Sequence, residues 1–387
     1  MSVTPAVLET VSRLVAFDST SRKSNLHIID YLKDRLMGLG AECRLTHDDE
    51  GGKANLYATL GPSDRPGIML SGHTDVVPTE GQAWSSDPYQ LVERNGALYG
   101  RGSADMKSFL ALGIALAPEF LARSLEIPLH FAFSYDEEVG CLGVRRLIDD
   151  LNSLPVKPRL CIVGEPTGMK VIAGHKGKRN FSCAVHGKEC HSALVAQGVN
   201  AVEAAAEMIA HIKQMQRDIR RDGPFDPAYE PPYTTLHTGV IEGGRALNIV
   251  PNRCNFEFEI RALPKQDVEA LTDSITSFAR DTLEPEMKAV HAAAGFDFTI
   301  MNDTDGFDLP DDDEAVLLAT ELTGDNRTGR VSFGTEAGLF NRAGIPTVVC
   351  GPGYIEQAHK PDEFISLDQL AQGEAFLRRL MDRICVD

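Results

Sequence analysis

The sequence predicts an α/β fold that carries a smaller α+β domain inserted in it. Short apolar runs bounded by turn residues are typical of buried strands, and several of them alternate with stretches of helical spacing. Strands that alternate with helices indicate a layered α/β structure. Beyond residue 176 the pattern changes to longer alternating strands and two long helical stretches, which indicates a separate domain.

The first part of the chain contains most elements of the larger domain. Leu8, Val11, Leu14 and Val15 recur at helical spacing, which predicts a helix over residues 5–17. Further helices are expected over residues 25–38, 108–122 and 144–151. Strands are expected over residues 55–60, 68–71, 129–134 and 160–164.

The middle of the chain predicts the inserted domain, over residues 176–302. Its strands are expected over residues 179–185, 234–241, 253–261 and 296–301, and its helices over residues 199–219 and 268–283. The order β-α-β-β-α-β is that of a ferredoxin-like domain. The larger domain then comprises residues 1–175 and 303–387. It closes with helices over residues 313–323 and 336–343, a strand over 345–350 and a helix over 367–384.

Composition narrows the classes of partner. The 387 residues carry a net charge of -18 at pH 7, whereas nucleic acids and anionic membranes both bind basic patches. We therefore expect neither as a partner. The N-terminus lacks the charged and apolar regions of a signal peptide, and no apolar run has the length of a membrane span. The eight cysteines are scattered without regular spacing, so a reducing cytoplasm is the expected location.

Imidazoles and carboxylates follow the ends of four predicted strands and one glycine-punctuated loop. They are His73, Asp75, Asp105, Glu137, Glu138, Glu165 and His359. In open α/β sheets, ligands bind outside the carboxyl ends of the strands. We therefore expect these side chains to gather at one edge of one sheet.

Such a set of side chains suits divalent cations. Two His and three carboxylates suffice for two ions if one carboxylate bridges them, and the lack of thiolates favours a catalytic site over a structural zinc site. Two ions about 3.5–4 Å apart can polarise a carbonyl. Of the adjacent pair Glu137 and Glu138, one would bind metal and the other would act as general base. Taken alone, the same pair is more typical of a solvated loop after a strand; coincidence at four strand ends and one loop weakens that interpretation.

Five segments resemble the zinc aminoacylase and carboxypeptidase family, which includes succinyl-diaminopimelate desuccinylase. They are residues 71–78 (SGHTDVVP), 100–107 (GRGSADMK), 136–140 (DEEVG), 164–167 (GEPT) and 191–192 (HS). The resemblance runs nearly end to end and implies a zinc-exopeptidase-like catalytic domain, a mixed sheet flanked by helices. It also implies that the inserted domain serves as a lid and pairs two subunits into a homodimer.

The resemblance further assigns roles to single residues. It implies two zinc ions per subunit, replaceable by cobalt, one on His73, Asp105 and Glu165 and the other on Asp105, Glu138 and His359. Asp105 is then the bridge, Asp75 orients His73, and Glu137 is the base. His191 would stabilise the oxyanion, reaching the partner subunit's active site. The expected substrate-binding residues are Asn248, Arg261, Gly334 and Thr335.

Two of these roles have structural alternatives that the sequence leaves open. Arg261 shares a strand face with Glu257 and Glu259 and could pair with them instead. Asn248 lies in a glycine-rich turn, where Asn is common for backbone reasons.

A second set of segments indicates the reaction. Residues 54–56 (ANL), 81–84 (GQAW), 246–251 (ALNIVP), 335–338 (TEAG) and 358–363 (AHKPDE) resemble the branch of the family that removes the acetyl group from N2-acetyl-L-ornithine. The implied reaction gives L-ornithine and acetate for arginine biosynthesis. The alternatives are desuccinylation of a diamino acid and hydrolysis of another N-acyl amino acid. A remoter alternative is a metal-binding dimer without catalysis, although such a protein would have no chemical need for Glu137 or His191.

Overall fold

The computed structural model describes residues 3–386, which divide into two compact units. Unit 2 comprises His175–Gly306 and Val331–Gly334, and unit 1 comprises the remaining described residues. Residues 331–334 therefore belong with the inserted segment, whereas the sequence placed them in the larger domain. The remaining unit boundaries fall within a few residues of 176 and 302.

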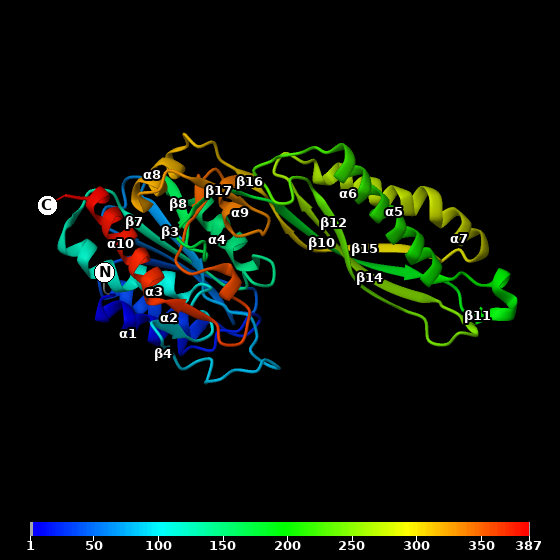
Figure 1. Cartoon of the computed structure of the whole chain (residues 1–387), viewed down its shortest axis with the longest axis horizontal. Helices are drawn as coiled ribbons and strands as arrows, with labels where there is room; N and C mark the ends of the chain where they lie inside the picture. Colours follow the sequence, from blue (N-terminus) through cyan, green and yellow to red (C-terminus); the bar gives the residue numbers. More distant parts are fainter. Residues whose placement is uncertain (1–2, 387) are drawn as a thin grey trace. The chain divides into compact units, whose positions relative to one another are not determined.

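Unit 1 is built on one mixed sheet (Figure 1). Its strands run in the order β1 (Glu42–His47), β2 (Ala54–Leu60), β7 (Leu129–Ser134), β3 (Ile68–His73), β8 (Leu160–Val163), β18 (Thr347–Val349), β9 (Val171–His175) and β16 (Phe307–Asp308), and β17 (Thr328–Val331) pairs with β9. Strand β3 is parallel to β7 and β8, and β18 is parallel to β8. The carboxyl ends of these four strands therefore lie at the same edge.

Helices flank this sheet. They are α1 (Pro5–Val15), α2 (Leu26–Met37), α3 (Lys107–Ala122), α4 (Leu142–Ser153), α8 (Glu314–Thr323), α9 (Ala337–Arg342) and α10 (Leu367–Ile384). Alternate residues of β8 explain why helices are needed on both faces. Leu160 and Ile162 belong to the apolar core that includes α1, α2, α3, α8 and α10, whereas Cys161 and Val163 are buried outside that core. Helices α4 and α9 contact each other and the strands.

Short elements complete unit 1. They are β4 (Val92–Arg94), β5 (Ala97–Tyr99) and β19 (Phe364–Ser366) in one small sheet, β6 (Ser124–Leu125) and β20 (Cys385–Val386) in another, and the 3₁₀ turn η3 (Ile355–Gln357). The sequence predicted none of these, nor β1, β9, β16 and β17. Strands of two to six residues give too few alternations to stand out from loops.

Unit 2 has the predicted element order. Its sheet runs β12 (Thr235–Gly243), β14 (Arg253–Ala262), β10 (Gly177–His186), β15 (Gly295–Thr304), and its helices α5 (Ala201–Asp222), α6 (Val268–Phe278) and α7 (Glu284–Val290) lie along it (Figure 1). On β14, Phe256, Phe258 and Ile260 are buried while Glu257 is exposed. Strand β10, the first of this sheet in the chain, therefore lies between β14, the third, and β15, the fourth. This is the ferredoxin-like arrangement, and it confirms the predicted fold class.

One helix of unit 2 is longer than predicted. The sequence ended it at Leu283, but α6 continues through a π-helical turn (Ala279–Leu283) into α7. Pro285 explains why the sequence predicts an end at Leu283 and why the turn before it is π-helical. Proline lacks the N–H that an α-helix needs, and its ring clashes with the preceding turn. The wider turn before Pro285 lets the chain stay helical.

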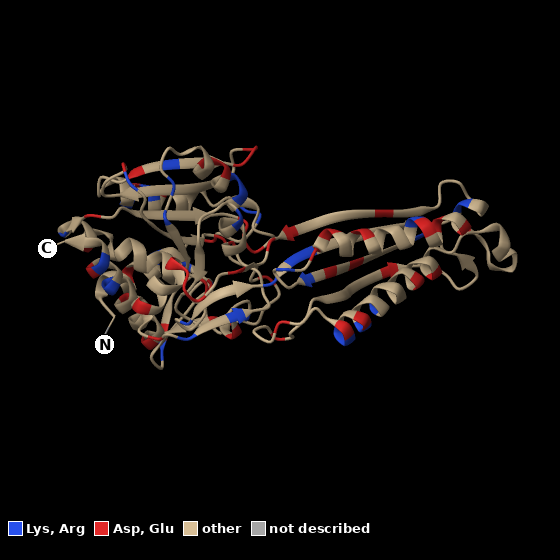
Figure 2. Cartoon of the chain, turned by 90° about the horizontal axis from the view of Figure 1, so that it is seen from above, with Lys and Arg blue, Asp and Glu red and all other residues tan. Residues whose placement is uncertain are grey.

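Charge is distributed over both units. Asp and Glu number 56 against 38 Lys and Arg, and Figure 2 shows acidic and basic residues interspersed on helices and strands of each unit. Within residues 3–386, no helix combines the length and the apolar character that crossing a bilayer requires.

Candidate metal centre

His73 stands at the end of β3 and is only 1% exposed. Its Nδ1 lies 2.8 Å from the backbone carbonyl of Asp75. A carbonyl only accepts, so Nδ1 carries a proton, and Nε2 is the nitrogen left for a cation. That Nε2 lies 3.0 Å from Oδ1 of Asp105 and 3.7 Å from Oε1 of Glu165. Nδ1 of His73 is therefore held as a metal ligand requires, and two carboxylates lie beside Nε2.

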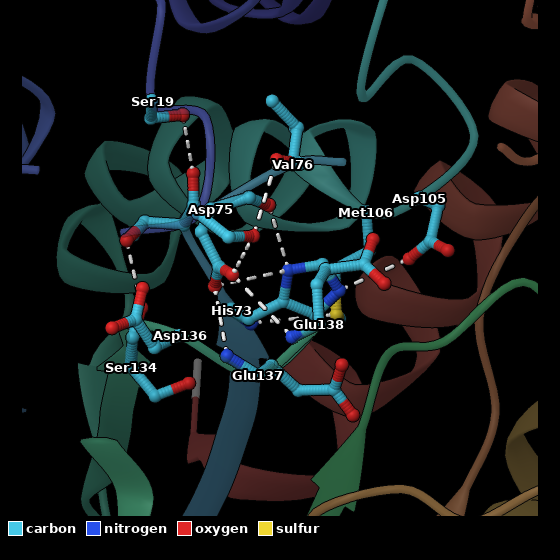
Figure 3. Close-up of polar contacts among 12 residues, drawn as sticks. Ser19, His73, Asp75, Val76, Asp105, Met106, Ser134, Asp136, Glu137 and Glu138 are labelled. Carbon is cyan, nitrogen blue, oxygen red and sulfur yellow. Dashed lines mark hydrogen bonds and ion pairs between the residues drawn. The ribbon is translucent and has the colours of Figure 1, made fainter. Parts of the chain in front are cut away.

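Asp75 contacts both His73 and the loop that follows β7 (Figure 3). Its carboxylate lies 3.6 Å from Nδ1 of His73, farther than its carbonyl. The carboxylate accepts the backbone N–H groups of Glu137 at 3.1 Å and Glu138 at 3.4 Å, and the hydroxyl of Ser21 at 2.7 Å. The sequence expected Asp75 to orient His73, and the structure adds that it fixes the Glu137 and Glu138 backbone.

Asp105 lies between two imidazoles. Its Oδ1 faces Nε2 of His73, and its Oδ2 lies 3.4 Å from Nε2 of His359. The same His359 nitrogen lies 3.0 Å from Oε2 of Glu138. A carboxylate that offers one oxygen to each of two histidine-containing groups has the geometry of a bridging ligand.

Glycine is required where β8 delivers Glu165. A side chain at Gly164 would bring its Cβ within 2.0 Å of the ring of Phe109, which is buried in α3. Only glycine lets this strand end pass over α3. The close approach places Glu165, which is 6% exposed, beside His73.

Two overlapping groups of side chains could each hold a cation. Their ligand atoms lie within 4.8 Å of one another, and the groups are His73, Glu137, Glu165 and His73, Asp105, Glu138. The predicted set for the first ion was His73, Asp105 and Glu165. In the first observed group, Glu137, expected as the base, takes the place of Asp105. His359 joins through its contacts with Asp105 and Glu138. The structure thus brings together all five predicted ligands and the predicted base.

Raised pKa values show that this cluster retains protons when no cation is bound. Burial raises the pKa of Glu137 to about 8 and also raises the pKa of Glu165. The hydrogen bonds that His359 donates to Asp105 and Glu138 raise the pKa of His359 to about 10. Burial opposes a charged His73, but its hydrogen bond to Asp105 and the charge of Glu165 raise its pKa nonetheless. Protons occupy positions that divalent cations would take.

The donor set fits divalent cations. It offers imidazole nitrogens and carboxylate oxygens without a thiolate, as catalytic zinc sites do. Buried carboxylates at this density are costly unless cations neutralise them. The residues present therefore suit two such ions, with Asp105 shared.

The pKa values predict how metal-free protein responds to pH. Because the pKa of Glu137 is raised to about 8 and that of His359 to about 10, the folded state holds more protons than the unfolded state near neutrality. The unfolding free energy of EDTA-treated protein should therefore fall as pH rises from about 5 to 8. Zinc-loaded protein should not show this fall, since cations replace the protons. Urea unfolding at several pH values, with and without zinc, checks the prediction, and equal slopes would contradict it.

The predicted oxyanion and substrate residues lie in both units. In unit 2, His191 ends β11 (Cys190–His191), which pairs with β13 (Ile249–Val250), and the carbonyl of Asn248 accepts the N–H of Ser192 at 3.0 Å. His191 and Asn248 are therefore neighbours, and both are exposed. Gly334 belongs to unit 2 and Thr335, which is buried, to unit 1.

Arg261 has partners of its own. Its Nε and Nη2 donate to the two carboxylate oxygens of Glu259 at 2.8 and 3.2 Å, and its Nη1 donates to the carbonyl of Ser332 at 3.3 Å. The structural alternative considered for this residue is thus the arrangement observed.

No role was expected for Glu336, which is 1% exposed and accepts the hydroxyl of Ser134 at 2.5 Å. Burial raises its pKa to about 7. A carboxylate at the start of a short helix is more often a solvated cap, so the residue type alone could not reveal its burial.

Comparison with known proteins places the chain among metallopeptidases. Residues 69–383 match the model of "Peptidase family M20/M25/M40". The chain is 35% identical over 386 residues to the acetylornithine deacetylase of Myxococcus xanthus, covering 98% of each chain. It is 34% identical to the acetylornithine deacetylase of Proteus mirabilis, covering 99% of this chain and 97% of that one.

Solved structures share the fold. An M20 family metallo-carboxypeptidase from Sulfolobus solfataricus superposes with a TM-score of 0.77 at 17% identity, covering 98% of this chain and 99% of that one. A dinuclear metal-binding M20 peptidase from Bacillus subtilis gives 0.66 at 15% identity, covering 97% and 96%. The family match spans most of the chain, and the fold and cluster agree with it. The chain belongs to peptidase family M20/M25/M40.

Proposed function

We propose that this protein is a metal-dependent amidohydrolase that removes the acetyl group from N2-acetyl-L-ornithine, giving L-ornithine and acetate for arginine biosynthesis. The observation that carries amide hydrolysis is the carboxylate of Asp105 between His73 and His359, with the half-buried Glu137 grouped with His73 and Glu165. The substrate is supported by the relatives of similar length, which are acetylornithine deacetylases.

The cations in this proposal are two zinc ions per subunit, for which cobalt can substitute. Nitrogen and oxygen donors without thiolates suit either ion. When bound, such ions polarise the amide carbonyl and lower the pKa of the attacking water. His73, Asp105 and Glu165 would hold one ion, and Asp105, Glu138 and His359 the other.

Glu137 moves the proton in this reaction. One carboxylate oxygen takes a proton from the attacking water as the water oxygen bonds to the acetyl carbon. Glu137 then gives that proton to the amide nitrogen as the carbon–nitrogen bond breaks. Acetate and the free α-amino group of ornithine result. The imidazole of His191 donates a hydrogen bond to the oxyanion formed in between.

The remaining assignments are also proposals. Asn248 and Arg261 would meet the substrate carboxylate, and Gly334 and Thr335 would line the binding loop. For Arg261 this requires release from Glu259. The ferredoxin-like unit would act as a lid and pair two copies into a homodimer. A cytoplasmic location suits a biosynthetic enzyme and scattered cysteines, and cell fractionation would check it.

A substrate panel tests the function. Zinc- or cobalt-loaded protein is offered N-acetyl, N-succinyl and N-formyl derivatives of ornithine, diaminopimelate and neutral amino acids. We expect kcat/KM for N2-acetyl-L-ornithine to exceed that for every succinylated compound by at least about tenfold, since pocket contacts discriminate acyl groups by this much or more. Preference for a succinylated diamino acid would replace the proposal by desuccinylation. No hydrolysis of any compound by metal-loaded protein would reject it.

A further inference from the structure

A buried ion pair lies behind the metal centre of unit 1. Arg101 and Glu363 are each 1% exposed, and Nη1 of Arg101 lies 2.7 Å from Oε2 of Glu363. A buried ion pair seldom adds stability over apolar packing, because both charges lose their hydration. The pair therefore needs another explanation, which its remaining contacts supply.

Glu363 holds the backbone of the predicted bridging ligand. Its second oxygen, Oε1, accepts the N–H of Asp105 at 3.0 Å and the N–H of Ala104 at 2.9 Å. Both oxygens of Glu363 are thus engaged, one by Arg101 and the other by the loop. These hydrogen bonds fix the backbone of Asp105, and with it the position from which its carboxylate extends.

Arg101 reaches the other side of the centre through Gln82. Its Nη2 donates to Oε1 of Gln82 at 2.6 Å, and its guanidinium carbon lies 5.0 Å from the ring of Trp84. The indole N–H of Trp84 also donates to Oε1 of Gln82, at 3.1 Å. With Oε1 held twice, the amide nitrogen of Gln82 points away from Arg101.

That nitrogen donates to the backbone carbonyl of His359 at 3.1 Å. His359 has a φ of 62°, in the left-handed region that residues with a Cβ rarely adopt. Its side chain is 50% exposed, so packing alone holds it weakly. Residues kept in such a conformation need the surrounding structure to hold them, and they cluster at functional sites. The hydrogen bond from Gln82 supplies one such restraint.

We propose that Gln82, Arg101 and Glu363 are positioning residues for the cation site: Arg101 and Glu363 hold Asp105, which both cations share, and Gln82 holds His359, which binds only the cation between Asp105, Glu138 and His359. The proposal rests on the cation site of the proposed function. The three side chains act through the backbones of Asp105 and His359. Arg101 and Glu363 cancel each other's charge, so the effect is one of geometry. Within residues 3–386, the Gln82 side chain hydrogen-bonds to His359 but not to His73 or Glu165. Its contribution therefore concerns the cation that His359 would bind.

Gln82 variants separate this role from a general one. Gln82→Ala removes the hydrogen bonds with Arg101, Trp84 and His359. Gln82→Glu retains an oxygen for Arg101 but, when ionised, has no proton to donate to the His359 carbonyl. Gln90→Ala, at an exposed position of the same loop, is the matched control. Metal-free samples of each variant are titrated with zinc against a chelator of known affinity.

We expect wild type and Gln90→Ala to bind two equivalents with the same two affinities. Both Gln82 variants should bind one equivalent normally and the other about 10- to 100-fold more weakly, as loss of a residue that orients a ligand typically does. Normal affinities in both Gln82 variants would overturn the proposal. So would equal weakening of both equivalents, or a lowered unfolding temperature of the metal-free variants, because either indicates a structural role.

The outcome is distinguishable from failure of the proposed function. If wild type binds two cations but hydrolyses no acylated amino acid, the function fails while the affinity pattern still decides the role of Gln82. If wild type binds fewer than two cations, the positioning proposal fails whatever it hydrolyses.

Discussion

Replacing Glu137 by glutamine should lower kcat about 10²- to 10⁴-fold, the range typical for loss of a general acid–base group. Glutamine has the same size but cannot take a proton from water or return it to the departing amine. In the metal-free protein burial raises the pKa of Glu137 to about 8, so this carboxylate takes up a proton more readily than an exposed glutamate does, which favours it as the proton carrier. Cation binding should survive, and measurements of kcat together with zinc stoichiometry check both halves of the prediction.

The neighbouring variant Glu138→Gln supplies the control. Glu138 contacts His359 at 3.0 Å, so its loss should weaken one cation rather than remove the proton carrier. The group formed by His73, Glu137 and Glu165 offers the competing interpretation, in which Glu137 is itself a ligand. If Glu137→Gln loses a zinc equivalent in parallel with kcat, that interpretation is correct and the base must be sought elsewhere.

His191→Ala should lower kcat about 10²- to 10³-fold, as expected for loss of an oxyanion donor. His191 lies in unit 2 and Glu137 in unit 1. If His191 serves the partner's site, mixing and re-equilibrating inactive His191→Ala and Glu137→Gln dimers should restore roughly a quarter of wild-type activity. Half of the dimers are then mixed, and one of their two sites has both residues.

Three outcomes would contradict a role of His191 in the partner's site. No recovery from dimers that demonstrably exchange subunits would mean that His191 acts within its own subunit or not at all. A His191→Ala variant with near-normal kcat would remove it from the mechanism. A protein that sediments as a monomer would reject the proposed pairing of the inserted units. Leu247→Ala, at a fully exposed position just before the β13 strand that pairs with His191, serves as a control for local disturbance of that sheet.

The sequence was sufficient for the long elements and for convergence of the ligands. Strands β3, β7 and β8 appear in the sequence as apolar runs because they are buried on both faces. Once parallel, they must deliver His73, Glu137 and Glu165 to one edge. Element order alone also predicted the four-stranded sheet of unit 2. The continuation of α6 past Pro285 was missed, because sequence signals treat proline as a stop.

The residues that support the ligands could not be found from the sequence. Arg101, Glu363 and Gln82 lie in loops, where charged and polar residues are usually solvated. Their burial depends on partners more than 250 residues away, such as Arg101 on Glu363. Arg261 illustrates the opposite case, since its pairing with Glu259 two residues away was one of two readable alternatives.

The most direct test of the account is the anomalous scattering of zinc in crystals of the zinc-loaded protein. A dinuclear site bridged by Asp105 should give two peaks about 3.5–4 Å apart, with the carboxylate of Asp105 between them, His73 and Glu165 on one and Glu138 and His359 on the other. A single peak, or two peaks that do not share Asp105, would contradict it.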